Sequence, residues 1–164
     1  MEAGGELGRM TLLLTLAFLA QPECRVGHVR ARLLVEAAQE ASARHRLPRG
    51  LLLAVVLVES GGRNVVARGR GKGKLGCDVG PAQIHVPRCV KSRVRWLLRP
   101  ARNVLVGAQI LARSRRKCSR YPWWYGCRGG LYGRYNPGSA SWGPEVRRVW
   151  SNLLKSCEVG RGTS

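Results

Sequence analysis

The sequence predicts a mostly helical single domain with long loops. Segments with apolar residues at three- and four-residue spacing, or with a continuous apolar run, alternate with stretches rich in Gly and Pro. A length of 164 residues suits one domain, and a composition that is 45% hydrophobic can bury a core despite a formal net charge of +20. We find neither an internal repeat nor a strong strand pattern. No apolar run reaches the roughly 18–20 residues that span a bilayer, so an integral membrane protein is not expected.

The N-terminal segment indicates export. Residues 11–20, TLLLTLAFLA, have the length of the apolar region of a signal peptide. Residues 1–23 are therefore expected to be a leader, residues 24–158 the folded domain and residues 159–164 a tail. The protein is then periplasmic or extracellular. The alternative is that the apolar segment forms a buried N-terminal helix.

Two helices are predicted after the leader. The first spans residues 26–46, and its apolar positions recur at helical spacing: Val26, Val29, Leu33, Ala37 and Ala41. Pro48 opens the second helix in its first turn. Leu51 to Val58 is apolar on every side, so this helix is expected to be buried. Glu59 and Ser60 come last, and the two glycines that follow are stop signals.

Two further helices are predicted between long loops. Residues 63–76 are rich in Gly and Arg and are expected to form a mobile loop, and residues 121–141 are aromatic and Gly-rich without periodicity. Pro100 opens a helix that ends at about Arg113. Its apolar stripe contains Val104, Ala108, Leu111 and Ala112. The last helix begins at Pro144, and its apolar face contains Val146, Val149, Trp150, Leu153 and Leu154.

The cysteines and the charge suggest a compartment and a class of partner. Six cysteines in a small chain fit a disulfide-stapled fold in an oxidising compartment, although the sequence does not choose the pairs. No CxxC pair exists and the three histidines are scattered, so we expect no metal or organic cofactor. The excess of 29 Lys and Arg over 9 Asp and Glu attracts polyanions such as nucleic acid, anionic lipid or acidic cell-wall polymer.

Glu59 is the strongest candidate for a catalytic residue. It follows a fully apolar run at the C-terminal end of a buried helix. Burial raises the pKa of a carboxyl group, and the negative end of a helix dipole raises it further. A carboxylic acid that stays protonated near neutral pH can act as a general acid. The alternative is that Glu59 only caps the helix and pairs with an arginine.

A second catalytic carboxylate is hard to find. Glycoside hydrolysis usually needs two carboxylates that flank the scissile bond. Only Asp78 looks available here, and it stands beside a cysteine that could form a disulfide. If the protein is a glycosidase, a mechanism with a single acid and assistance from the substrate is favoured.

Four motifs in the expected order carry a resemblance to a known family. They are Glu59-Ser60 after the apolar helix, D-V-G-P-A-Q-I-H at residues 78–85, P-A-R-N-V-L-V-G-A-Q-I-L at residues 100–111, and Y-N-P-G at residues 135–138. They resemble the motifs of the soluble lytic transglycosylases, over residues 26–154. The secreted members that accompany invasion and conjugation look most similar. The resemblance implies a lysozyme-like fold (the SLT domain) and cleavage of peptidoglycan.

The resemblance also implies roles for individual residues. Glu59 would protonate the glycosidic oxygen between N-acetylmuramic acid and N-acetylglucosamine, and would then accept the proton of the muramyl C6 hydroxyl. That hydroxyl closes a 1,6-anhydro ring. Ser60, Gln83, Tyr135 and Asn136 would bind substrate. Their other interpretations are structural: helix capping for Ser60, loop bracing for Gln83, and an ordinary turn for Tyr135 and Asn136.

Other residues are given structural roles or two alternative roles. Asp78 is expected to be a turn acid, and Asn103 to brace the start of a helix. An aromatic cluster is either a sugar-stacking wall or core: Trp123, Trp124 and Tyr125. The chain departs from the family where Pro81 and Ala82 replace Leu-Met, and where His85 stands for the common Asn. These departures concern the details of substrate binding more than the chemistry.

Three alternatives to a lytic transglycosylase remain open. A hydrolytic muramidase would use water in place of the C6 hydroxyl. A non-catalytic, cationic wall-binding protein would use the charge without Glu59. A nucleic-acid-binding protein explains neither the cysteines nor the leader, so no specific nucleic acid is expected.

The expected partners are peptidoglycan strands, an anionic wall polymer and a secretion or conjugation machine, and we expect a monomer.

Overall fold

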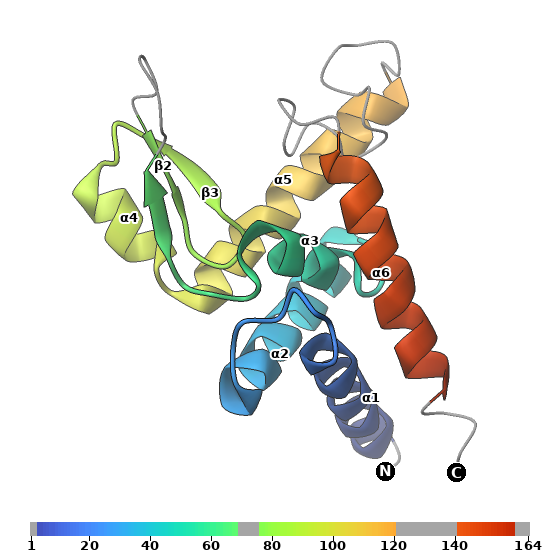
Figure 1. The fold of residues 1–164 in the computed structure, drawn as a ribbon. Helices are drawn as coiled ribbons and strands as arrows, with labels where there is room; N and C mark the ends of the chain where they lie inside the picture. Colours follow the sequence, from blue (N-terminus) through green and yellow to red (C-terminus); the bar gives the residue numbers. More distant parts are fainter. Residues whose placement is uncertain (1–2, 69–75, 121–140, 160–164) are drawn as a thin grey trace.

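A computed structural model of the chain describes residues 3–68, 76–120 and 141–159 (Figure 1). This part of the chain forms six helices and three short strands. In chain order they are α1 (Ala3–Leu19), α2 (His28–His45), α3 (Leu51–Ser60), β1 (Val66–Arg68), β2 (Gly76–Val79), β3 (Ile84–Pro87), α4 (Lys91–Leu97), α5 (Pro100–Arg120) and α6 (Trp142–Val159). The prediction of a mostly helical single domain is confirmed, and α3 lies at its centre with the sheet and α6 on opposite sides.

The small sheet was not predicted from the sequence. Its strands are antiparallel in the order β1-β2-β3, and Asp78 pairs with Ala67 on one side and with His85 on the other. The sequence shows no strong strand pattern because these strands are only 3 or 4 residues long, too short to establish an alternating pattern. Part of the predicted loop 63–76 is therefore strand, while residues 69–75 lie outside the described residues.

Helix α3 supplies the centre of the core. All its residues from Leu51 to Leu57 are buried, as the apolar run predicts. It begins at Leu51 and not in a turn opened by Pro48, because Gly50 has a left-handed φ of 74° just before it. The indole of Trp150 from α6 lies close to Gly50, so that a Cβ there would meet it at 3.4 Å. Helices α3 and α6 are thus packed against each other.

Helix α2 buries a face that overlaps the predicted stripe only in part, at Ala41 and, partly buried, Ala37. Val29 and Leu33 of the expected stripe are 76% and 58% exposed. The residues that face the core are Ala31, Leu34, Val35, Ala38, Ala41 and Ser42. This set also has helical spacing, and its small members let α2 pack against both α5 and α1. The sequence contained two helical stripes, and the packing on two sides selected the one rich in alanine.

The second half of the chain contains one helix more than predicted. Helix α4 is short and strongly basic, which hid its apolar positions in the sequence. Helix α5 buries the predicted stripe but continues to Arg120, about two turns beyond the expected end at Arg113. Its last turns are rich in Arg and Lys, which the dipole at a helix C-terminus favours. Helix α6 begins at Trp142, before the predicted start at Pro144, and buries Val146, Val149 and Leu153.

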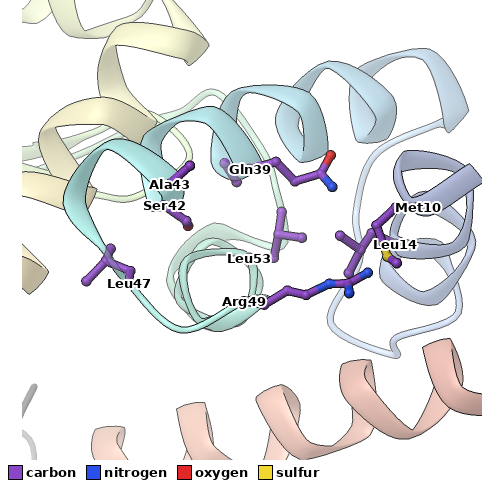
Figure 2. Close-up of a pocket in the computed structure, with 10 residues that line it drawn as sticks. Met10, Leu14, Gln39, Ser42, Ala43, Leu47, Arg49 and Leu53 are labelled. Atoms are coloured by element: carbon purple, nitrogen blue, oxygen red, sulfur yellow. The ribbon is translucent and has the colours of Figure 1, made fainter. Parts of the chain in front are cut away.

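Helix α1 packs against α2 and α6 in the full chain. Leu14, Ala17 and Phe18 are buried in the core, and the hydroxyl of Thr11 donates a hydrogen bond of 2.9 Å to Oε1 of Gln39. A cavity of about 340 Å³ lies between α1, α2 and the start of α3 (Figure 2). The assignment of residues 1–23 as a leader stays a prediction, because the packing of α1 does not test whether the segment is cleaved. Within the described ranges, no helix combines the length and the apolar character needed to cross a membrane.

None of the disulfide staples expected from the cysteines joins two of the described cysteines. No two cysteines there lie at bonding distance, and Cys24, Cys77 and Cys89 carry free thiols. Cys127 lies outside the described residues. The core is closed by apolar packing from all six helices and from β2 and β3.

Candidate active site

The last turn of α3 places Glu59 at the edge of the core. Gly61 follows the helix with a left-handed φ of 64°, and its N–H donates to the carbonyl of Leu57 at 2.8 Å. A Cβ at Gly61 would lie 2.3 Å from the carbonyl oxygen of Glu23, so only glycine fits there. The α3 helix therefore ends directly after Ser60 by a steric requirement, which fixes the position of Glu59.

The carboxyl group of Glu59 is half-buried and accepts one strong hydrogen bond. The indole Nε1 of Trp142 donates to Oε1 of Glu59 at 2.7 Å. Burial raises the pKa of Glu59 to about 7, against the lowering effect of the Trp142 hydrogen bond. The negative charges of Asp78 and Glu145 contribute to this raised pKa. Near neutral pH this carboxyl group is therefore divided between its acid and its carboxylate form.

Trp142 is a functional candidate that the sequence analysis missed. Its side chain is 4% exposed at the first residue of α6. A buried tryptophan needs an acceptor for its N–H group, and this one finds it in Glu59. The available signal was the tryptophan itself, placed just before an amphipathic helix. Sequence reasoning considered only the aromatic cluster of residues 123–125 as a wall of the site.

Ser60 joins α3 to the turn between β2 and β3. Its side chain is buried, and its Oγ lies 2.7 Å from the carbonyl oxygen of Pro81 and 3.3 Å from that of Val56. The shorter distance marks Pro81 as the main acceptor. This contact fits the structural interpretation of Ser60. A contact between Ser60 and substrate stays a prediction.

Asn103 holds the same turn from the other side. This buried residue of α5 donates from Nδ2 to the carbonyl of Val79 at 2.6 Å and accepts at Oδ1 from the N–H of Ala82 at 2.7 Å. Gly80 has a left-handed φ of 76°, and a Cβ there would lie 2.3 Å from Nδ2 of Asn103. Asn103 therefore has a structural role, as expected, but it braces the β2–β3 turn and not the start of its own helix.

Gln83 closes the turn that Ser60 and Asn103 support. Its φ of 45° is left-handed, and its amide Nε2 donates to the carbonyl of Gly80 at 2.7 Å. The side chain is half-buried. This hydrogen bond fits the bracing role, and the contact between Gln83 and sugar stays a prediction.

Asp78 and His85 face each other across β2 and β3. They are register partners in the sheet, and Oδ1 of Asp78 lies 3.0 Å from Nδ1 of His85. Both side chains are exposed. Asp78 therefore has a partner of its own, which fits its expected role as a structural acid.

Several predicted site residues cannot be placed. Tyr135 and Asn136 lie outside the described residues, as do Trp123, Trp124 and Tyr125. Among the residues that the structure describes, no group of three His, Cys, Asp or Glu side chains could hold a metal ion. The cavity of Figure 2 is formed by other residues than Glu59 and contains no carboxylate in its lining. The placed part of the candidate site is the α3 end, the β2–β3 turn and the start of α6.

Comparisons with protein-family models, with curated proteins and with solved structures give no match for this chain. The four motifs and the geometry around Glu59 are therefore the basis of a functional assignment. That geometry offers one carboxyl group that can donate a proton and take one back near neutral pH.

Proposed function

We propose that this protein is a peptidoglycan lytic transglycosylase with Glu59 as its catalytic acid and base. The observation that carries the proposal is the half-buried carboxyl group of Glu59, whose pKa is raised to about 7 at the end of the central helix. The first of the four motifs that resemble the family contains this residue, and the other three follow it in the chain. The motifs at residues 78–85 and 100–111 meet at the β2–β3 turn, which Asn103 of α5 holds and which accepts the hydrogen bond of Ser60 from α3.

The proposed reaction uses both protonation states of Glu59. In the acid form Glu59 donates its proton to the glycosidic oxygen, and the bond from that oxygen to C1 of the muramyl sugar breaks. The carboxylate then takes the proton of the C6 hydroxyl, whose oxygen forms the new bond to C1. The products are an N-acetylglucosamine end and a 1,6-anhydro-muramyl end, and Glu59 has its proton again. A pKa near the working pH serves a group that acts first as acid and then as base.

The hydrolytic muramidase is the nearest rival. An inverting or retaining hydrolase with two carboxylates needs a second one that is available beside the scissile bond. Asp78 is the acid of the β2–β3 hairpin, and its carboxylate is already paired with His85. This pairing favours attack by the C6 hydroxyl of the substrate over a mechanism that uses Asp78.

The charge distribution supports a wall polymer as a second contact. Residues 79–144 contain no Asp or Glu, so the described cations of α4 and α5 have no acidic neighbour on their own helices. Trp96 on α4 is partly exposed, with the guanidinium groups of Arg93 and Arg102 at 4.7 Å and 5.4 Å from its ring centre. We propose that this cationic side helps an exported monomer to stay on anionic wall material, at a site that a secretion or conjugation machine must cross. A cationic binding protein without catalysis is the competing hypothesis.

The deciding experiment is mass spectrometry of muropeptides from purified peptidoglycan. The wild type, Glu59→Gln and the control Glu36→Gln are compared, since Glu36 is an exposed glutamate of α2 that pairs with Arg32. Anhydro-muropeptides from the wild type and the control only would support the proposal. Reducing ends that depend on Glu59 would indicate a hydrolase, and wall binding without any product would indicate the cationic binding protein.

A further inference from the structure

Cys77 and Cys89 are brought together by the β2–β3 hairpin. Cys77 lies in β2, is 0% exposed and pairs with Val86 of β3. Cys89 follows β3, and its N–H donates to the carbonyl of the same Val86 at 3.2 Å. Arg88 and Cys89 both have left-handed φ values, 56° and 48°, which is uncommon for residues other than glycine. This tight turn reverses the direction of the chain after β3. As a result, Cys77 and Cys89 are both neighbours of the same residue, Val86.

The two thiols lie close enough to influence each other. The Cys77 thiol is deprived of solvent by its burial and has the Cys89 thiol as a hydrogen-bond partner, and both effects raise the pKa of Cys77, to about 11. Cys89 is half-buried and packs against the core cluster that contains Cys77. One thiol is therefore accessible to solvent and the other is enclosed behind it.

We propose that Cys77 and Cys89 form a disulfide bond that closes the hairpin when the protein is in an oxidising compartment. The closed segment contains the turn at residues 80–83, which accepts the hydrogen bond from Ser60 and is held by Asn103. The disulfide would link the two ends of the segment 77–89, which contacts the C-terminal end of α3 through Ser60. This proposal does not depend on the reaction that Glu59 catalyses.

The difference in access gives the order of the steps. The thiolate of Cys89 attacks a sulfur of an external disulfide, such as oxidised glutathione or a thiol oxidase, and one thiolate of that oxidant leaves. Cys77 then loses its proton to solvent and attacks the Cys89 sulfur in the mixed disulfide, and the second thiolate leaves. Two protein thiols become one disulfide, and the oxidant takes up two electrons and two protons as two thiols.

A peptide map of the full chain tests the proposal directly. The protein is oxidised with oxidised glutathione, its remaining thiols are blocked by alkylation, and it is digested with trypsin without reduction. Trypsin cleaves after Lys74, Arg88 and Lys91, which places Cys77 in peptide 75–88 and Cys89 in peptide 89–91. We expect these two peptides to appear linked and to separate on reduction. Alkylated Cys77, or Cys77 linked to a peptide other than 89–91, would overturn the proposal.

Thermal unfolding gives a second, independent measurement. Closing a loop of this size constrains the unfolded chain, and reduction is expected to lower Tm by roughly 5–10 °C. Cys89→Ser should lose the part of this response that comes from the hairpin, whereas Cys24→Ser should keep it because Cys24 lies away from the hairpin, near Val26. An equal response in Cys89→Ser would contradict the proposal. The peptide map uses the wild type alone, so it decides even if Cys89→Ser does not fold.

Discussion

Trp142 and Glu59 are 83 residues apart in the chain and share a hydrogen bond of 2.7 Å between Nε1 and Oε1. This bond connects the first residue of α6 to the last turn of α3. It holds one of the two carboxyl oxygens of Glu59, so that under the proposed function the other oxygen would exchange the proton with the substrate. Because the indole stabilises the carboxylate form, Trp142 lowers the pKa of Glu59 against the larger effect of burial.

Replacing Trp142 should change the pH profile of the proposed activity. Trp142→Phe keeps an aromatic ring in the core but removes the N–H donor, so the pKa of Glu59 should rise above its value of about 7. The acid form then persists to higher pH, and the alkaline limb of kcat/KM should move in that direction, with a several-fold loss at the optimum. The measurement is the rate of release of muropeptides against pH.

The control for this prediction lies on the same helix. Trp150 also donates an indole hydrogen bond, to the carbonyl of Arg49 at 2.7 Å, but it does not touch Glu59. Trp150→Phe should leave the alkaline limb in place. If the two variants shift the profile equally, the effect comes from packing of α6 and not from the hydrogen bond.

Glu59 should also make stability depend on pH. Its pKa is about 7 in the folded protein against 4.5 for the unfolded reference, so between these values the folded state holds more protons and stability falls as pH rises. The loss is complete above pH 7, and for this half-buried group it is about 2 kcal/mol. Glu59→Gln does not titrate, so relative to wild type it should gain about 2 kcal/mol between pH 4 and pH 8.

Urea unfolding of both proteins at pH 4 and pH 8 measures this difference. Glu36→Gln serves as control because Glu36 is exposed and paired with Arg32. A stability difference between Glu59→Gln and wild type that stays constant with pH would show that Glu59 has an ordinary pKa. The proposed role as a general acid would then lose its physical basis.

The β2–β3 turn should not tolerate a side chain at Gly80. Gly80→Ala places a methyl group 2.3 Å from Nδ2 of Asn103 at a left-handed φ of 76°, so backbone and side chain must both shift. A loss of roughly 2–4 kcal/mol in the free energy of unfolding is expected. Gly27→Ala is a suitable control, because nothing lies within 4 Å of a Cβ there. Equal urea midpoints for the two variants would contradict the close contact.

The hydroxyl of Ser60 should contribute to stability. Ser60→Ala removes the 2.7 Å hydrogen bond to the carbonyl of Pro81 and should cost roughly 1–2 kcal/mol. Ser156→Ala removes a similar bond to the carbonyl of Asn152 on the exposed side of α6 and should be nearly neutral. If Ser60→Ala instead leaves unfolding unchanged and raises KM, the serine serves substrate and not the turn.

Removal of residues 1–23 tests the place of α1. The burial of Leu14, Ala17 and Phe18 predicts that a chain of residues 24–164 unfolds at a lower temperature than the full chain. Calorimetry of both forms measures the difference. Equal Tm values would mean that α1 adds nothing to the fold, in agreement with its prediction as a leader. The mass of the exported protein would then show whether it is cleaved.

The sequence predicts best the features that depend on near neighbours in the chain. The run from Leu51 to Val58 after Pro48 predicts a buried helix, and the glycines after Ser60 mark its end. The face of α2 was mistaken because two stripes had helical spacing and only the neighbouring helices could select one. The strands were too short to leave a pattern, since 3 or 4 residues cannot establish alternation.

The candidate site shows the same limit. Glu59 was found because burial and helix position can be read locally from the sequence. Trp142 was missed because its contact depends on how α6 crosses α3. Asn103 was given a structural role, but its partners Val79 and Ala82 lie in another element and could not be named.

The acidic residues are unevenly distributed, so the molecule has an asymmetric charge distribution and orients in an electric field. Glu36 and Glu40 offset two arginines of α2, whereas the stretch from 79 to 144 has no carboxylate to offset its cations. A surface covered with polyanions therefore attracts the protein and also exerts a torque on it. We expect this torque to turn α4 and α5 toward the surface before contact. The rate of productive encounters, and not only the strength of attachment, should then fall as ionic strength rises.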